Sequence, residues 1–378
     1  MPSEVSTAAS ADKPSVLIIG GLGFVGRNLT KYIHDNNLAS EIRIVDKHLP
    51  ELAWLAPEFK EACSRERFMQ ADAAQEKSLQ RIFDREGGAQ FDYVFNCGGE
   101  TRFSQEDKVY ELRSYGLSMA IGREAAKRKI RCFSELSTGL VYKPDSTPRK
   151  ESDKLKPGIN LAKWKLKAEE DLAKLDGLNL LVFRLPQVYG PYTTKYLSTA
   201  LCMARVYQSK GKEMRFLWKD DLRTNTVHID DTVRALWHGS EWYVKEPSRK
   251  PVPIFNIVDH GNTSQKQTAQ FMAEIFNIET GFHGTLISAF ARLNLDHVVD
   301  EVNDETLDPW AELQQAAGIS HSTPLSPFME KELLRDADLS MDGSLFEKET
   351  GFTYKYDKLT KEGVQEILES YKRMNWWP

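Results

Sequence analysis

Short apolar runs alternate with amphipathic segments along the first half of the chain. The runs at 15–20 (SVLIIG), 41–46 (EIRIVD) and 91–99 (FDYVFNCGG) are typical of buried strands. The segments between them repeat apolar residues at helical spacing. Strands joined through helices need crossover connections, which make the strands parallel and put helices on both faces of the sheet. The pattern therefore predicts an α/β fold, a Rossmann-type doubly wound parallel sheet.

Further elements extend this alternation and then lose regularity after residue 190. We expect additional strands at 67–72, 130–137, 178–185 and 252–259, and helices at 24–37, 74–86, 110–129 and 160–171. We assign residues 1–13 to a disordered tail, and 14–190 with about 225–260 to the domain that contains this sheet. Residues from about 191–224 and 261–378 are expected to form a smaller substrate-binding lobe.

Composition narrows the class of protein without naming a reaction. The 378 residues carry a net charge of −5, which argues against nucleic acid as the main partner. No run reaches the 18 or so apolar residues of a membrane span, and the first residues resemble neither a secretory signal nor a transit peptide. Four cysteines without CxxC spacing favour reduced thiols, a cytoplasmic location and no metal site: Cys63, Cys97, Cys132 and Cys202.

A glycine-rich loop follows the first strand and opens the first helix. Its glycines are Gly20, Gly21, Gly23 and Gly26, and Phe24–Val25 lie at the helix start. Small residues let the backbone approach a pyrophosphate, and the helix N-terminus supplies free N–H groups and a positive dipole end. The loop therefore predicts a dinucleotide site, with a tight turn that binds nothing as the alternative.

An acidic residue at the end of the second strand bears on the choice of dinucleotide. Asp46 lies twenty residues beyond Gly26. A carboxylate there accepts hydrogen bonds from ribose hydroxyls and repels a 2′-phosphate. We therefore expect NAD rather than NADP, although the neighbouring cation of Lys47 weakens the preference.

The order of later motifs resembles the extended short-chain dehydrogenases/reductases of the NAD-dependent epimerase/dehydratase family. GGLGFVG, MQADAA, VFNCGGET, ELSTGLVY, FRLPQVYGP, TVHIDDTVRAL and IFNIVD follow one another as the family's blocks do. This resemblance implies further cofactor contacts beyond the glycine loop. They fall on Asp72, Ala73, Cys97, Gly98, Gly99, Leu185 and Val188.

The resemblance also implies a Ser/Thr, Tyr and Lys set, of which this chain keeps two members. Thr138 occupies the Ser/Thr position, and Lys165 with Glu169 matches the family's Lys-x-x-x-Glu. The lysine would bind the nicotinamide ribose and lower the pKa of the tyrosine, which otherwise titrates near pH 10. The tyrosine position, four residues before the lysine, holds Leu161, which cannot transfer a proton.

The same helix contains two other lysines, Lys163 and Lys167. Residues four apart share a helix face, so these two lie together while Lys165 points away from them. We expect Lys163 and Lys167 in solvent and Lys165 directed inward, with a solvated Lys165 as the alternative.

Two further departures from the family pattern lie beside the expected nicotinamide position. Gly98-Gly99-Glu100 stands where the family has Ala-Ala. Arg113 takes the position of the asparagine in the family's next helix. Glu100 is expected to pair with Arg102 or Arg113. Our first hypothesis for a substitute acid/base is nevertheless Glu100, on the ground that its pKa could be raised there.

Candidate substrate contacts come from the second half of the motif set. Tyr142 and Tyr189 occupy family positions that pack or line the pocket, and the guanidinium of Arg223 suits a substrate phosphate. His228 and Asp230 are expected to stabilise the junction between the lobes.

Three functions remain open from the sequence. The first is an atypical NAD-dependent enzyme acting on a small molecule, such as a nucleotide sugar. The second is a non-catalytic NAD-binding sensor or subunit, and the third is a reductase of another small molecule. The resemblance also implies a homodimer through the helix at 111–129 and the helix at 160–171.

Overall fold

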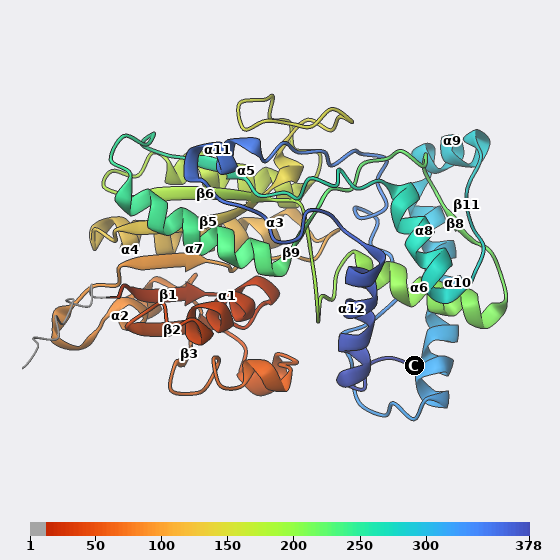
Figure 1. Ribbon diagram of the computed structural model, residues 1–378, viewed down its shortest axis with the longest axis horizontal. Helices are drawn as coiled ribbons and strands as arrows, with labels where there is room; N and C mark the ends of the chain where they lie inside the picture. Colours follow the sequence, from red (N-terminus) through yellow and green to blue (C-terminus); the bar gives the residue numbers. More distant parts are fainter. Residues whose placement is uncertain (1–12) are drawn as a thin grey trace, which may run out of the picture.

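A seven-stranded parallel sheet forms the centre of the molecule, as the computed structural model shows for residues 13–378 (Figure 1). The predicted tail at 1–13 lies outside the described residues apart from Lys13. The strands follow the order of a doubly wound sheet. In space they are β10 (Ile254–Asn256), β6 (Leu180–Leu185), β5 (Cys132–Thr138), β4 (Tyr93–Asn96), β1 (Ser15–Ile19), β2 (Glu41–Asp46) and β3 (Phe68–Gln70).

Strand β1 illustrates why the predicted strands form. All five of its residues are buried, because a central parallel strand is covered on both faces. Val16 and Ile18 join one apolar cluster, and Leu17 and Ile19 join the other. The two clusters are the cores on the two faces of the sheet. All seven sheet strands were predicted, and the predicted fold class is confirmed.

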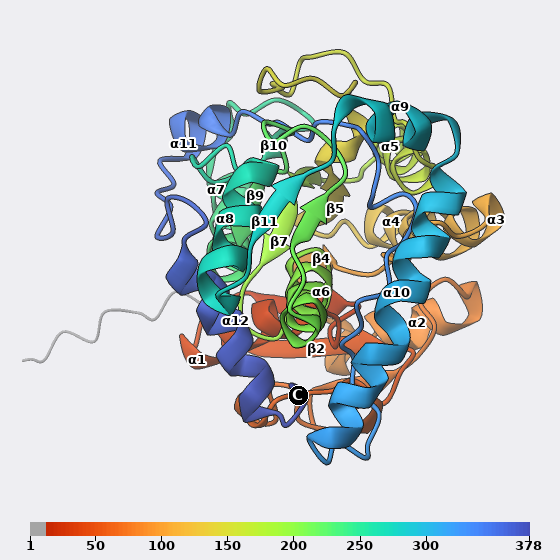
Figure 2. The same ribbon diagram turned by 90° about the vertical axis from the view of Figure 1, so that its right-hand side faces the viewer.

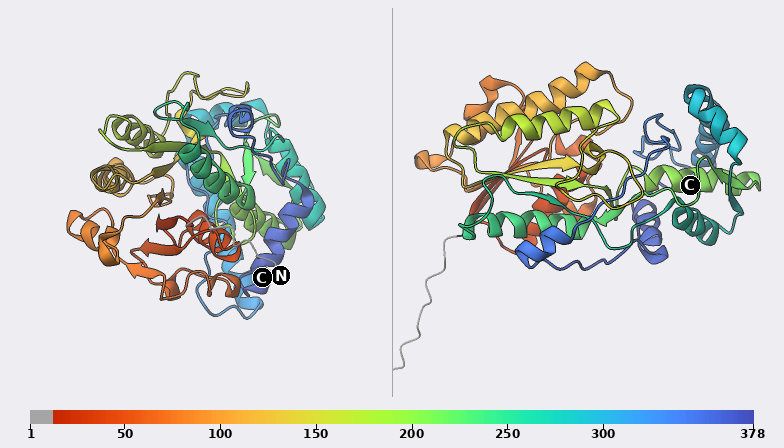
Figure 3. Two further views of the ribbon diagram at one scale, coloured as in Figure 1. Left: turned by 60° about the vertical axis from the view of Figure 1, so that its left-hand side comes forward. Right: turned by 90° about the horizontal axis from the view of Figure 1, so that it is seen from above.

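Helices cover both faces of this sheet (Figure 3). On one face α1 (Phe24–Asp35) packs against α7 (Ile229–Lys245). The other face carries α2 (Glu76–Phe83), α3 (Asp107–Tyr110), α4 (Leu117–Lys127) and α5 (Asn160–Leu172). A π-helical segment, Glu111–Gly116, joins α3 to α4 within the helix predicted at 110–129.

A second lobe extends beyond the carboxyl edge of the sheet (Figure 2). It contains two short parallel strands, β8 (Met214–Phe216) and β11 (Thr280–Phe282). A further strand pair, β7 (Gln187–Tyr189) with β9 (Thr226–His228), connects the sheet with this lobe. Its helices are α6 (Leu197–Lys210), α8 (Gln265–Phe276), α9 (Thr285–Leu293), α10 (Leu295–Ala316) and α12 (Lys361–Arg373).

One late helix lies apart from this lobe. The helix α11 (Ser344–Thr350) packs against β10 and α7, beside the large sheet. The chain thus returns to the sheet within the range 261–378 that we assigned to the substrate lobe. Within residues 13–378, no helix is both long enough and apolar enough to span a membrane.

Candidate functional site

The glycine loop takes a conformation that only small residues permit. Gly20 has φ +70°, and a Cβ there would lie 2.7 Å from Gly98 Cα. A Cβ at Gly26 would collide with the Gly20 carbonyl oxygen. The loop after β1 therefore touches the loop after β4, and α1 begins close against β1. No side chain caps the N-terminus of α1 at Gly23, so the first-turn N–H groups are available for an anion.

Asp46 closes this loop from the neighbouring strand. Its carboxylate accepts hydrogen bonds from the N–H groups of Leu22 (3.3 Å) and His48 (3.1 Å). The structure therefore places the acidic residue beside the glycine loop, as the motif predicted. Lys47 follows it on the exposed side.

Apart from Val188, which lies in the separate β7–β9 pair, the other expected cofactor residues lie at the ends of strands of the same sheet. Asp72 follows β3 and accepts a hydrogen bond from the N–H of Ala74 (3.0 Å), while Ala73 is buried. Leu185 ends β6, and Val188 lies in β7. All these strands are parallel, so their carboxyl ends meet at one edge with the glycine loop.

Lys165 points inward from α5 to this edge, as expected. Its side chain is 11% exposed, and its Nζ donates to the Leu136 carbonyl oxygen (2.7 Å) and to Glu135 Oε1 (3.3 Å). A Cβ on Gly99 would lie 3.7 Å from the same Nζ. The ammonium thus lies between the ends of β4 and β5.

The outer lysines of α5 are in solvent, which confirms the prediction for them. Lys163 is 55% exposed and pairs with Asp107 at 3.1 Å. Lys167 is 46% exposed and pairs with Asp171 at 2.8 Å. Both are surface ion pairs of the kind that adds little to stability.

Glu135 is a functional candidate that sequence reasoning missed. Its side chain is fully buried in β5 and accepts hydrogen bonds from Asn96 Nδ2 (2.6 Å) and Ser118 Oγ (2.9 Å) in addition to Lys165. The Asn96 side-chain oxygen accepts from the Gly98 N–H (3.1 Å). A chain of hydrogen bonds therefore runs from Gly98, in the loop that touches the glycine loop, to Lys165. The available signal was a carboxylate inside an otherwise uncharged strand segment.

Leu161 fills the tyrosine position with apolar packing. It is 8% exposed and belongs to a cluster with Tyr110, Ile159 and Ala162, which Leu140 also contacts. No proton-transferring side chain takes its place in this cluster, because the Tyr110 hydroxyl donates to the Arg102 carbonyl oxygen (2.8 Å).

Thr138 ends β5 as the motif places it. Its Oγ1 accepts a hydrogen bond from the N–H of Leu140 (3.2 Å) and so caps the 3₁₀ turn Gly139–Val141. This is a structural role for Thr138, beside the catalytic one that the resemblance implies. The hydroxyl proton remains available to a ligand, since only the acceptor function is used.

The raised pKa proposed for Glu100 is wrong. Burial alone would raise it, but hydrogen bonds from Arg102 and Arg113 lower the pKa of Glu100 to about 2. The distances from Glu100 Oε2 are 2.7 Å to Arg102 Nη2 and 3.2 Å to Arg113 Nη1. The two departures from the family pattern, Glu100 and Arg113, therefore compensate each other as an ion pair.

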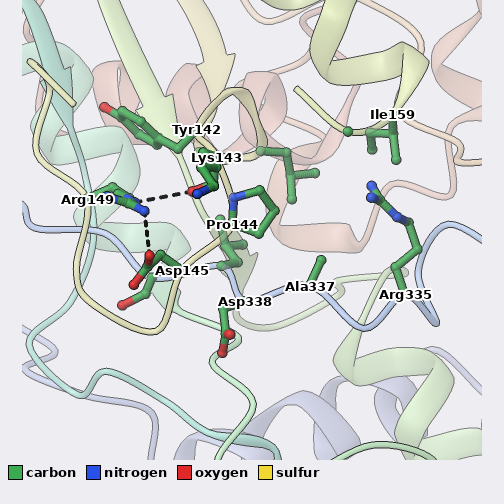
Figure 4. A pocket seen from close by; sticks show the side chains of 14 residues that line it. Tyr142, Lys143, Pro144, Asp145, Arg149, Ile159, Arg335, Ala337 and Asp338 are labelled. Carbon is green, nitrogen blue, oxygen red and sulfur yellow. Dashed lines mark hydrogen bonds and ion pairs between the residues drawn. The ribbon is translucent and has the colours of Figure 1, made fainter. Parts of the chain in front are cut away.

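The two candidate tyrosines are both held in protein contacts. Tyr142 donates to Asn256 Oδ1 (2.8 Å) and accepts from Arg184 Nη1 (2.8 Å), and burial raises its pKa to about 12. Tyr189 is 2% exposed and packs edge-on against His228. The structure brings Tyr142 to the edge of a small cavity (Figure 4), whereas Tyr189 lines neither of the described cavities.

His228 and Asp230 lie where the lobes meet, as expected. The His228 ring stacks on Tyr356 from the C-terminal segment, with ring centroids 3.7 Å apart, and Tyr356 donates to Asp230 Oδ2 (3.2 Å). Burial lowers the pKa of His228 to about 4, so the ring is neutral at pH 7. It accepts a hydrogen bond from the N–H of Asp230 (3.1 Å).

A buried ion pair fixes α5 to the sheet and was not predicted as such. Arg184 Nη2 of β6 lies 2.6 Å from Glu169 Oε2 of α5, and both side chains are at most 3% exposed. The hydroxyl of Ser137 also donates to Glu169. The ion pair holds α5, which carries Lys165, against β6, and the Ser137 bond holds it against β5, which carries Glu135.

Arg223 lines a cavity enclosed by the second lobe. The cavity, here called the C-lobe cavity, has a volume of about 190 Å³ and reaches Leu140 and Ile159 at the cofactor edge. A single water needs roughly 10–15 Å³ by this measure, so the cavity can take a small organic molecule. The structure therefore places Arg223 where a ligand could contact it.

All four cysteines are free thiols, and burial raises the pKa of Cys97 to about 12. Residues 13–378 contain no cluster of three or more His, Cys, Asp or Glu side chains that could hold a metal ion.

Comparison with known protein families agrees with the resemblance seen in the sequence. The model of the NAD dependent epimerase/dehydratase family matches residues 16–257, which is more than half of the chain. The chain therefore belongs to the NAD dependent epimerase/dehydratase family.

Solved structures of similar fold are distant in sequence. The Bordetella bronchiseptica enzyme WbmG, solved with NAD and UDP, shares 15% identity at a TM-score of 0.66, with 97% of each chain covered. A Thermotoga maritima UDP-glucose 4-epimerase with UDP-glucose shares 18% identity at 0.63, covering 95% of this chain and 99% of that one. A Bacillus cereus UDP-N-acetylglucosamine 4-epimerase shares 13% at 0.63, covering 94% and 95%. At these identities the likeness shows the fold alone.

Proposed function

We propose that the protein binds NAD along the carboxyl edge of its sheet and does not use the tyrosine-based proton transfer of its family. The glycine loop would hold the pyrophosphate at the start of α1, and Asp46 would accept bonds from the adenosine ribose. The fit is supported by the cradle at Gly20 and Gly26, which a Cβ would fill, and by the uncapped helix. The carboxylate of Asp46 favours NAD over NADP.

Further contacts would follow the remaining strand ends. We propose cofactor contacts for Asp72, Ala73, Cys97, Gly98, Gly99, Leu185 and Val188. Lys165 would bond the nicotinamide ribose, with Thr138 as a second hydrogen-bond donor nearby. NAD, when bound, supplies a hydride acceptor; the side chains described here position it.

The observation that carries this proposal is the pairing of Lys165 with a fully buried carboxylate, next to a leucine in the tyrosine position. Glu135 Oε1 lies 3.3 Å from the lysine Nζ, so the positive charge that would activate a phenol is compensated. Leu161 offers no proton. The arrangement supports holding a cofactor better than it supports acid/base chemistry, as in an NAD-responsive sensor or a subunit of an assembly.

A second candidate is an oxidoreductase whose substrate proton passes to water. The C-lobe cavity favours it, because Leu140 and Ile159 of the cavity wall flank the elements that carry Thr138 and Lys165. A ligand in this cavity would thus lie beside the cofactor edge. The nucleotide sugars bound by similar structures are one ligand class for it, with Arg223 as a proposed contact in this cavity and Tyr142 as one at the small cavity.

The test is direct. Purified protein is denatured and assayed for released NAD or NADH, and NAD-free protein is titrated with NAD by calorimetry. We expect saturable binding, with no reduction of NAD when UDP-glucose or a simple secondary alcohol is added. Protein that neither carries nor binds NAD would overturn the proposal, and NADH formation on such a substrate would favour the oxidoreductase.

A further inference from the structure

The C-lobe cavity has walls that are mostly apolar. They come from α6, β8 and its following turn, α8, α10 and the segment before α11. The apolar wall is represented by Met203, Met214, Phe216, Leu217, Trp218 and Val302. Such a surface gains by covering an apolar molecule, whereas sugar hydroxyls that meet the apolar wall would lose water without gaining a partner.

One side of the cavity carries donors without partners. Arg223 Nε and Gln265 Nε2 are buried and have no hydrogen-bond partner in the described part of the chain. Arg223 Nη1 donates to the Asn262 carbonyl oxygen (3.0 Å), which fixes the guanidinium in the wall. Both residues line the cavity, so an anionic group bound there would have the guanidinium of Arg223 and the amide of Gln265 as its nearest donors.

The side chains that line the cavity carry more positive than negative charge. Three arginines line the cavity, and Glu332 is its one carboxylate. Arg215 pairs with Glu213 at 2.7 Å, and Glu332 accepts from the N–H of Ser104 (2.7 Å). Within residues 13–378 no carboxylate lies within 4.0 Å of the guanidinium of Arg223, and Asp338 accepts a hydrogen bond from the backbone N–H of Arg223 (2.8 Å).

Arg335 extends this positive side toward the cofactor edge. It lines both the C-lobe cavity and a small neighbouring cavity of about 20 Å³, where its side chain lies beside Ile159 (Figure 4). A Cβ on Gly158 would lie 2.6 Å from Arg335 Nη2, so the glycine leaves room for the guanidinium. The small cavity holds at most one water. A ligand would therefore lie in the larger cavity, with Arg335 at the end nearer Lys165's helix.

We propose that the C-lobe cavity binds a predominantly apolar small molecule with one anionic oxygen group, such as a carboxylate, held by Arg223 and Gln265. This deepens the proposed function by naming the ligand class of the cavity beside the cofactor edge. It separates this protein from the nucleotide-sugar class, whose ligands carry a diphosphate and several sugar hydroxyls.

The test uses 8-anilinonaphthalene-1-sulfonate, an apolar fluorophore with one anionic group, and the full chain. We expect saturable fluorescence, energy transfer from tryptophan, displacement by decanoate and no displacement by UDP-glucose. Arg223→Met should weaken binding at least tenfold, and Ala200→Phe, which fills the cavity, should abolish it. Arg65→Met, at a surface residue outside the cavity lining, should bind as wild type.

Other outcomes overturn the inference. These are no saturable binding, displacement by UDP-glucose but not by decanoate, or unchanged binding in both Arg223→Met and Ala200→Phe. NAD binding is measured on the same samples. Loss of NAD binding with the fluorophore still bound would count against the proposed function alone, and the reverse result would count against the ligand class alone.

Discussion

Lys165 and Glu135 form an ion pair at the carboxyl edge of the sheet, and this pairing limits what the lysine charge can do. In a tyrosine-based site the lysine charge would act on the phenol, but here the carboxylate lies 3.3 Å from it, inside the protein. Two opposite charges at this distance largely cancel each other's field at a third group. Restoring the tyrosine alone should therefore leave the introduced phenol without an activating cation.

Paired variants test this cancellation. In Leu161→Tyr the introduced phenol should titrate at an ordinary or higher pH, since it enters an apolar cluster. In the double variant with Glu135→Gln the lysine charge is released, and the phenol should titrate at least about one pH unit lower. Ultraviolet difference titration measures both, with Leu161→Phe as the phenol-free control. Equal titration in the two variants would contradict the cancellation.

Glu100 should contribute to stability rather than to proton transfer. Its folded pKa, about 2, is below the ordinary value of 4.5, so its contribution is full above pH 4.5 and is lost as pH falls toward 2. Both arginine partners are about half exposed, and solvent screening limits the effect to roughly 2 kcal/mol. Glu100→Gln should lose about that much at pH 7 in urea unfolding, and its stability should fall less steeply with acid than that of wild type. A wild-type stability and acid profile in this variant would refute the ion-pair role.

Helix α5 is positioned by the buried pair of Glu169 with Arg184. Arg184 also donates to the hydroxyl of Tyr142 (2.8 Å), so the pair links α5, β6 and the turn after β5. Removing one member leaves a buried charge without compensation.

This link can be tested by single and double replacement. Glu169→Gln should destabilise the protein by about 3–5 kcal/mol in urea unfolding. The double variant Glu169→Leu with Arg184→Met removes both charges and should recover most of that loss. A single variant as stable as wild type would show that the pair does not fix the helix.

At the level of elements, the sequence was most informative where strands are buried on both faces. A continuous apolar run such as 15–19, bounded by turn residues, is typical of a central strand of a covered sheet, and all seven predicted sheet strands were found. The second lobe was less predictable, because β8 and β11 have three residues each and pair across more than sixty residues of chain. Neither strand is long enough for its sequence pattern to predict which strand it pairs with.

The candidate site, too, could be predicted only in part from the sequence. The glycine loop and the inward Lys165 follow from local spacing. The burial of Glu135 depends on Asn96 of β4 and Ser118 of α4, which no local pattern connects. The pKa of Glu100 is lowered mainly by Arg102, two residues along the chain, and further by Arg113; this pairing was expected from the sequence, but its effect on the pKa was not.

At the scale of the whole molecule, a homodimer through the α4 and α5 side stays a prediction. Leu112, in the π-helical segment before α4, is 56% exposed, which suits a contact surface. Light scattering should give twice the chain mass for wild type and the chain mass for Leu112→Asp. Leu286→Asp on α9 changes a leucine that is 84% exposed in the other lobe, and it should leave the dimer intact. A monomeric wild type would rule the dimer out.

Measuring NAD binding by two lysine variants of α5 tests whether Lys165 helps to hold NAD. Calorimetry should show that Lys165→Met binds NAD at least tenfold more weakly than wild type, a difference of about 1.4 kcal/mol. Lys163→Met, two residues away and facing solvent, should bind as wild type. Urea unfolding confirms that both variants are folded. Equal NAD affinity in the two variants, or no NAD binding by wild type, would contradict the account.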